Sequence, residues 1–334
     1  MEVRGYPVHF GVQLQAQGTT WQAYAEAVQA VEALGFSSVW TFDHMLPFSG
    51  PDNRACFETL TTLSAMAMLT SRARIGVLVN GVLYRDPATL AKAAAQVDNM
   101  TGGRLDFSLG AAWAEREFKA YGLAFPPLPE RYTRLDEALS VVKLLWAEER
   151  ANFKGRYYQL DDAPCEPKPV QKPHPPIMIG GSGRGSLRMA AVHGDRLNVI
   201  GSPQDCATRA AELKQQCAKA GRDPMEVELS VHPTLALAHT AEEAEDLAAL
   251  IESRLNGGLP PEVPASPAEP ETGLSPQPRS VKRANWLVGT PSDVAEGIKR
   301  YFDAGISHFV FGFGHPFDLA PLRLFQEEVV PALG

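Results

Sequence analysis

The chain has 334 residues, of which 45% are hydrophobic and 21% are charged, and its formal net charge is −8 at pH 7. This length and composition fit a globular domain with a full core, and they are ordinary for a (β/α)8 barrel that carries insertions. The negative charge, without any basic run, argues against nucleic acid as a partner.

The N-terminal segment and the cysteines predict a protein of the cytoplasm. Residues 1–14 lack a charged segment followed by an apolar one, so we expect no secretory signal there. No apolar run approaches the length of a membrane span, and we expect no membrane partner. The four cysteines are scattered and form no CxxC pair. We therefore expect reduced thiols, without a disulfide framework and without a metal site.

Short apolar runs alternate with helical patterns in the first part of the chain. Four such units in succession predict parallel strands joined by right-handed crossovers. The expected strands are 8–14, 38–45, 73–80 and 105–109; the expected helices start at 19 or 20, at 57 and at 86 or 87, and end at 35, 69 and 100.

The alternation continues after two insertions. A hairpin near 150–162 and a Pro-rich connector at 163–176 follow a strong helix over 130–146. Residues 256–279 are rich in Pro, Gly, Glu and Ser, which is typical of a mobile loop. The remaining expected strands are 177–179, 196–200, 227–237 and 309–313; the remaining helices end at 193 and span 204–220, 242–255, 291–305 and 322–330.

These patterns contain eight strand candidates, with a helix between most of them. One α/β domain over 1–334, a (β/α)8 TIM barrel, is the simplest interpretation. An open, doubly wound sheet is the alternative.

The pair Asp43-His44 closes the second predicted strand, where a barrel carries its chemistry. Histidine transfers protons near neutral pH, and an aspartate can fix the tautomer of an imidazole. Adjacent strand residues point to opposite faces, so only one of the two can face the barrel axis. The alternative is that His44 only hydrogen-bonds a loop carbonyl.

Two further loops carry candidate binding residues. Gly180 to Gly185 lies between a strand and a helix, and glycines there let a phosphate approach the backbone and the helix N-terminus. Its spacing matches neither a dinucleotide fingerprint nor a hydrolase elbow, and a simple tight turn is the alternative. Small residues beside Trp113, after the fourth strand, suit a flat ring close to the backbone, whereas a core tryptophan is the alternative.

Taken together, these residues resemble the luciferase-like monooxygenase family, and most closely its coenzyme F420-dependent branch. The stretches that carry the resemblance cover most of the chain apart from about 202–283. They are TFDHMLP (41–47), TSRARIGVLVNGVLYRDPATLAK (70–92), the run 97–131, the run 166–191 and LVGTPSDVAEGIKRYFDAGISHFVFG (287–312).

The resemblance implies a (β/α)8 barrel with a deazaflavin or flavin ring in its mouth. It assigns proton transfer to His44 and contact with the ring to Asp43, and it places a non-prolyl cis peptide in the third-strand segment. The implied cofactor-binding residues are Asp43, Leu78, Val79, Asn80, Ala111, Trp113, Arg116, Gly180, Gly181, Ser182, Gly183 and Arg184. Some F420 enzymes have an acid where this chain has Trp113 and an amide where it has Arg116, which puts a sugar-phosphate dehydrogenase activity in doubt.

The expected function is hydride transfer between F420 and a small organic substrate, with His44 moving the proton. One alternative is an FMN-dependent monooxygenase that uses O2 and a separate flavin reductase. Others are a flavin- or deazaflavin-binding protein without turnover and an unrelated sugar-phosphate barrel. The resemblance also suggests a homodimer, and the position of 256–279 suggests a lid over the mouth.

Overall fold

Eight parallel strands form a closed barrel in this computed structural model, which describes residues 1–256 and 283–334. The last two strands in the ring pair through Ser230 with His308 and through Val231 with Phe309, which closes it. The (β/α)8 prediction is confirmed, and an open sheet is excluded. In ring order the strands are β3 (His9–Leu14), β4 (Ser38–Thr41), β5 (Arg74–Val77), β6 (Leu105–Leu109), β9 (Ile177–Gly180), β10 (Arg196–Val199), β11 (Glu228–Val231) and β14 (His308–Phe313).

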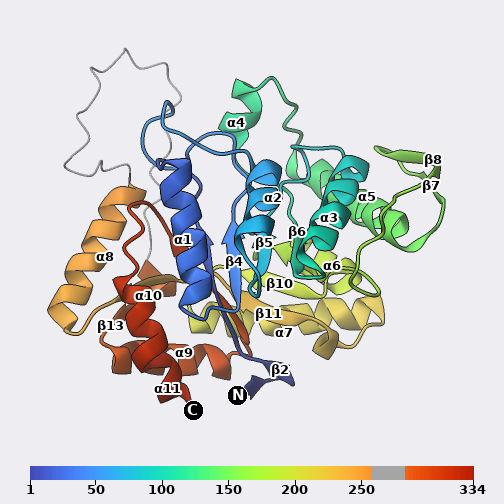
Figure 1. The fold of residues 1–334 in the computed structure, drawn as a ribbon. Coiled ribbons are helices and arrows are strands. Elements are labelled where there is room, and N and C mark those ends of the chain that lie inside the picture. Colours follow the sequence, from blue (N-terminus) through green and yellow to red (C-terminus); the bar gives the residue numbers. More distant parts are fainter. Residues whose placement is uncertain (257–282) are drawn as a thin grey trace.

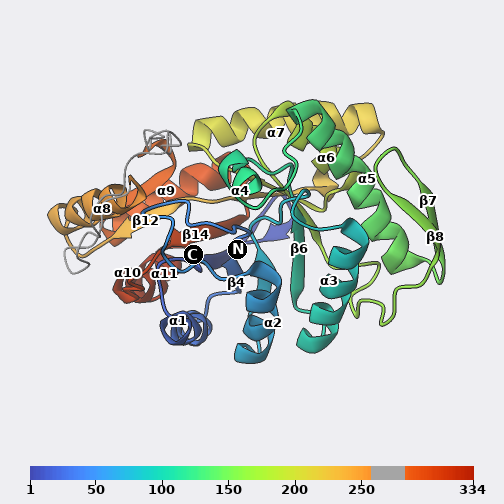
Figure 2. The same ribbon diagram turned by 90° about the horizontal axis from the view of Figure 1, so that it is seen from above.

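Helices surround the barrel, as Figures 1 and 2 show from the side and from above. The expected caps are present: Thr20 accepts a hydrogen bond from the backbone N–H of Ala23, and Asp86 accepts one from Ala88. The helices are α1 (Trp21–Ala33), α2 (Thr59–Leu69), α3 (Pro87–Thr101), α4 (Glu115–Ala120), α5 (Leu128–Ala147), α6 (Arg184–His193), α7 (Pro203–Ala220), α8 (Ala241–Leu255), α9 (Pro291–Asp303), α10 (Ala320–Leu324) and α11 (Val330–Leu333), with short turns η1 (Pro224–Glu226), η2 (Arg283–Asn285) and η3 (Phe325–Val329).

Several elements differ from the prediction: α4 and the strands β1 and β2 were not expected, and β4 and β5 end at Thr41 and Val77, before the expected ends at 45 and 80. The strand expected over 227–237 is two strands, β11 and β12 (Thr234–Leu237), because Pro233 has no N–H to continue the ladder. β12 pairs in parallel with β13 (Trp286–Gly289), a strand that the sequence pattern did not reveal. The helix expected over 322–330 is interrupted by η3, a single π-helical turn.

The small insertions lie outside the barrel. β7 (Ala151–Lys154) and β8 (Gln159–Ala163) form an antiparallel hairpin at the outer edge of α5 (Figures 1 and 2). β1 (Glu2–Val3) and β2 (Tyr6–Pro7) form another close to the two chain ends, which lie together at the bottom of Figure 1. The predicted loop 256–279 lies, apart from Asn256, outside the described residues.

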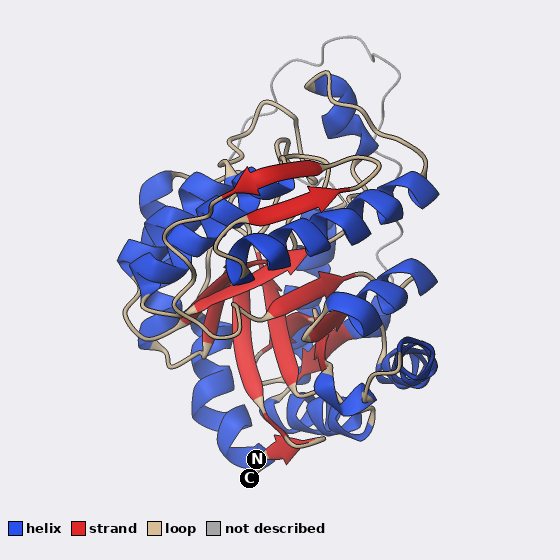
Figure 3. Ribbon diagram, turned by 90° about the vertical axis from the view of Figure 1, so that its right-hand side faces the viewer, coloured by secondary structure: helices blue, strands red, loops and turns tan. Residues whose placement is uncertain are grey.

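The core has two layers, which Figure 3 shows as strands enclosed by helices. The larger layer lies between strands and helices, and a smaller cluster of Trp40, Met178 and Val310 fills the barrel interior. No helix in the described part of the chain is long and apolar enough to cross a membrane.

Ion pairs fill the amino-terminal end of the barrel. Arg74 lies 2.8 Å from Asp106, and Arg196 lies 2.5 Å from Glu228 and 3.6 Å from Asp106. These charges compensate one another, so the candidate chemistry belongs to the opposite, carboxyl-terminal end of the strands.

Candidate active site

One carboxylate holds the imidazole of His44, which follows β4. Nδ1 of His44 lies 2.6 Å from Oε1 of Glu117, a residue of α4. The other oxygen, Oε2, accepts the backbone N–H of Met45 at 2.8 Å and the hydroxyl of Tyr84 at 2.8 Å. The Glu117 side chain is 2% exposed and that of His44 is 11% exposed. The imidazole is therefore partly exposed, while the carboxylate that holds it is buried.

The partners of Glu117 determine the tautomer of His44. Burial raises the pKa of Glu117, but the hydrogen bond and charge of His44 and the bonds from Met45 and Tyr84 outweigh it, so the pKa lies below its usual value. Burial raises the pKa of Tyr84, followed in size by the nearby charge of Glu117, so its hydroxyl keeps its proton. An ionised carboxylate only accepts hydrogen bonds, so the proton between the pair is assigned to Nδ1. Nε2 is left to exchange a proton with a ligand.

The carboxylate of Asp43 is held by neighbours other than His44. Its Oδ1 accepts the hydroxyl of Thr59 at 2.7 Å, its Oδ2 accepts the N–H of Gly81 at 2.8 Å, and Nη1 of Arg85 lies 2.9 Å from both oxygens. Our hypothesis that Asp43 fixes the imidazole is therefore corrected: Glu117 has that role. β4 ends at Thr41, so Asp43 and His44 lie in the loop after the strand, where their side chains reach different partners. Asp43 instead joins β4 to the loop after β5.

That loop contains the expected cis peptide, between Leu78 and Val79. The side chain of Val79 packs against Gly180 at the end of β9, where an added Cβ would lie 2.6 Å from Cγ2 of Val79. The carbonyl of Leu78 accepts a hydrogen bond from Nε2 of Gln13 at 2.8 Å, and Oε1 of Gln13 lies 3.0 Å from Nε2 of His232. Burial lowers the pKa of His232 to about 4, so this neutral ring donates to Gln13.

Asn80 is buried in the same loop. Its Nδ2 donates to the carbonyl of Ser108 at 3.1 Å. Its Oδ1 is buried and has no hydrogen-bond partner within the part of the chain that the structure describes. A buried acceptor of this kind is suited to a ligand donor.

The Gly-rich loop presents an open helix N-terminus. Gly183 precedes α6 without a side-chain cap, the first turn of α6 has no acidic residue, and Arg184 is exposed. Tyr132 of α5 lies against Gly185, where an added Cβ would come within 2.4 Å of the ring, and its hydroxyl lies 3.0 Å from Oγ of Ser186. Ser182 accepts the N–H of Ile200 at 3.2 Å, which ties the loop to the end of β10. The free N–H groups of this turn are suited to an anion.

The loop after β6 brings Trp113 to His44. Their ring centroids lie 5.3 Å apart at an angle of 71°, and Trp113 is 53% exposed, so it is not a core tryptophan. The carbonyls of Ala111 and Ala112 accept hydrogen bonds from Arg131. Arg116 is paired with Asp52 and donates to the carbonyl of Pro47 at 2.9 Å. Its guanidinium thus braces the loop after β4.

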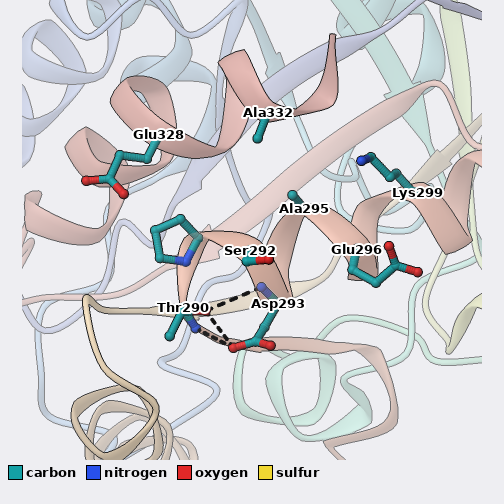
Figure 4. Close-up of a pocket in the computed structure, with 9 residues that line it drawn as sticks. Thr290, Ser292, Asp293, Ala295, Glu296, Lys299, Glu328 and Ala332 are labelled. Carbon is teal, nitrogen blue, oxygen red and sulfur yellow. Dashed lines mark hydrogen bonds between the residues drawn. The ribbon is translucent and has the colours of Figure 1, made fainter.

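The candidate residues therefore meet at the ends of four adjacent strands, β4, β5, β6 and β9. A surface hollow of about 600 Å³ lies elsewhere, at the start of α9 (Figure 4). Its Thr290 and Asp293 are occupied in capping that helix, and none of the candidate residues lines it. Within the described residues, no group of three or more His, Cys, Asp or Glu is placed to hold a metal ion.

The role of Asp43 is tested by Asp43→Asn. An amide leaves Arg85 without one of its carboxylates, so we expect the free energy of unfolding in urea to fall by about 3 kcal/mol, the lower end for a broken buried pair. The control Asp52→Asn breaks an exposed pair and is expected to cost at most about 1 kcal/mol. If Asp43→Asn were as stable as the wild type but had lost turnover, Asp43 would act in catalysis instead.

Comparisons with known proteins agree with this geometry. The family model described as luciferase-like monooxygenase matches residues 6–308. An F420-dependent glucose-6-phosphate dehydrogenase of Kineococcus radiotolerans is 30% identical over 100% of this chain and 99% of that protein. An FMNH(2)-dependent dimethylsulfone monooxygenase of Pseudomonas putida is 28% identical over 94% of this chain and 86% of that protein.

The fold also matches a solved F420-dependent secondary alcohol dehydrogenase in complex with an F420-acetone adduct. The TM-score is 0.80 at 22% identity, over 98% of this chain and 99% of that one. The closed barrel, the histidine after β4, the cis peptide after β5 and the match over most of the length lead to one conclusion. The chain belongs to the luciferase-like monooxygenase family.

Proposed function

We propose that this protein is an F420-dependent oxidoreductase that exchanges a hydride with a small organic substrate. The observation that carries the proposal is the imidazole of His44, anchored through Nδ1 by a buried carboxylate at the mouth of the barrel. The F420-dependent names of full-length relatives support the choice of cofactor.

The residues present fit this cofactor. F420, when bound, supplies a ring that accepts or donates a hydride. Val79 and Asn80 would lie behind that ring, with Oδ1 of Asn80 as a free buried acceptor. Gly183 and Arg184, at the uncapped start of α6, would hold the cofactor phosphate. Asp43 would support the ring site through Gly81 and Arg85.

His44 would move the proton that accompanies the hydride. With Nδ1 protonated, neutral His44 accepts a proton at Nε2 from a substrate hydroxyl, and imidazolium returns one to a carbonyl oxygen. Glu117 stabilises the imidazolium by its charge and keeps the ring in place.

Titration of the purified chain with F420, and separately with FMN, tests the choice of cofactor. We expect F420 to quench or shift its fluorescence with a Kd at least about tenfold lower than that of FMN, a difference of about 1.4 kcal/mol. Tighter binding of FMN would favour the monooxygenase, with its reductase and O2, which the dimethylsulfone monooxygenase relative represents. Binding of neither would contradict the proposal.

The roles of His44 and Glu117 are tested by the variants His44→Gln and Glu117→Gln in the F420-loaded protein. His44→Gln removes the proton carrier, so we expect kcat to fall by about 10²- to 10⁴-fold. Glu117→Gln replaces a charged hydrogen bond worth about 1.5–3 kcal/mol, which corresponds to about 10- to 150-fold in kcat. The Kd for F420 should stay within about twofold in both variants, since neither is proposed to hold the cofactor. Unchanged rates in His44→Gln would contradict His44 as the proton carrier.

We further propose that the chain forms a homodimer through α2. This helix has no charged residue between Thr59 and Leu69, and its Met68 is 73% exposed. An uncharged helix face with an exposed large apolar side chain is typical of a contact surface.

Sedimentation velocity tests the dimer. We expect the wild type to sediment as a dimer. Met68→Glu places a charge in the contact, so we expect it to raise the dissociation constant of the dimer at least tenfold. The control Leu250→Glu changes a side chain on α8 that is 41% exposed and should leave the equilibrium unchanged. A monomeric wild type, or an equally dimeric Met68→Glu, would refute this interface.

A further inference from the structure

We infer that the part of the substrate next to His44 is an uncharged, apolar ring, and that Trp113 and Phe48 select it. This inference rests on the proposed function and names its substrate class: neutral secondary alcohols with an aromatic or alicyclic ring, and the matching ketones. Sugar phosphates, the substrates in the names of several relatives, are expected to be poor substrates.

Aromatic side chains border the imidazole of His44. Ring centroids of Phe42, Phe48 and Trp113 lie 5.2, 5.5 and 5.3 Å from its centroid. Phe42 is buried, whereas Phe48 and Trp113 come from two different loops, after β4 and after β6, and Trp113 is 53% exposed. A large exposed aromatic ring beside a proton carrier offers an apolar contact to whatever the proton carrier touches.

Two charged residues of α4, Glu117 and Arg116, are engaged by other described groups of the protein. Glu117 is held by His44, Met45 and Tyr84, and it is almost fully buried. Arg116, which lies three residues after Trp113, is paired with Asp52. These groups therefore offer no free cation to a phosphate beside the imidazole.

Asp43 and Arg85 are paired with each other below the same loops. Arg54, further along the loop after β4, donates to the carbonyl of Gly18 at 3.3 Å, on the side of β3. The pairing of Asp43 with Arg85 agrees with an uncharged substrate group at His44.

The chemistry of the Phe48 and Trp113 rings determines which substrates are preferred. The ring carbons of Phe48 and Trp113 offer no hydrogen bonds, so a phosphate or sugar hydroxyls placed against them would lose water without replacement, which costs free energy. A phenyl or cyclohexyl ring loses no hydrogen bonds and gains contact area against Trp113.

The reaction in the direction of oxidation is balanced as follows. The C–H bond at the alcohol carbon would break, and F420, when bound, would supply the two-electron acceptor that takes up its hydride. The O–H bond breaks and its proton passes to Nε2 of His44, while the C–O bond becomes the C=O bond of the ketone. His44 then releases the proton to solvent.

The first test measures rates with the F420-loaded full chain. Loss of F420 absorbance is followed with 1-phenylethanol, cyclohexanol and glucose 6-phosphate. We expect kcat/KM for both ring alcohols to exceed that for glucose 6-phosphate by at least about 100-fold. If F420 binds and glucose 6-phosphate is oxidised as well as or better than the ring alcohols, or if no ring alcohol reacts, the substrate inference is overturned while the cofactor proposal stands. If F420 does not bind, the proposed function itself has failed.

The second test asks whether Trp113 contacts substrate or cofactor. We expect Trp113→Ala to raise the KM for 1-phenylethanol by about 10- to 100-fold, with a smaller effect on kcat and with the Kd for F420 within about twofold. Trp113→Phe keeps a flat ring and should recover most of the loss. Trp21→Ala, at a 42% exposed tryptophan on α1, is the matched control and should change neither constant. A weakened Kd for F420 with an unchanged KM would make Trp113 a cofactor contact and overturn the inference.

Discussion

The hydrogen bond between His44 and Glu117 is the interaction on which the rest of the site depends. It joins the end of β4 to α4, across 73 positions of the chain, at 2.6 Å. The carboxylate is 2% exposed, and ionisation so far from water is stabilised only because Met45, Tyr84 and His44 all donate to it. The same set of donors leaves Nε2 as the outer nitrogen. Position and tautomer of the imidazole thus have one physical cause.

The surrounding loops are braced by pairs of the same kind. Asp43 holds the loop after β5 through Gly81 and Arg85, and Arg116 holds the loop after β4 through Asp52. Charged side chains that look available in a sequence, such as Asp43 and Arg116, are paired and fix these loops, whereas Arg184 stays exposed at the start of α6. Among the described residues, the groups accessible at the mouth are the imidazole of His44, the rings of Phe48 and Trp113, and the open start of α6. That combination suits a flat cofactor with an anionic tail and a substrate with an apolar ring.

Much of the fold could be predicted because its cause is local. The alternation of apolar runs and helical patterns predicts eight strands, and cap residues such as Thr20 mark helix starts. Pro233 divides one predicted strand, and β13 was missed because four residues give little periodicity. The cis peptide at Leu78 was expected only through the family resemblance, since its conformation depends on neighbours such as Gly180.

The site was predictable only in part because its contacts are long-range. His44 could be chosen from its place at the end of a strand, but its partner could not. Glu117 and Glu115 lie in the same short helix, and only the packing of α4 against the barrel makes the first buried and leaves the second exposed. The neighbour in sequence, Asp43, was therefore the natural choice and an incorrect one for this role.

The central claim is that Glu117 holds His44 as the Nδ1-protonated tautomer, and NMR of the protein labelled with ¹⁵N-histidine tests it most directly. The resonances of His44 are assigned from the spectrum of His44→Gln. At a pH where the ring is neutral, the account predicts a protonated Nδ1 and an unprotonated Nε2, and a loss of this preference in Glu117→Gln. A neutral His44 protonated at Nε2, or a tautomer unaffected by Glu117→Gln, would contradict it.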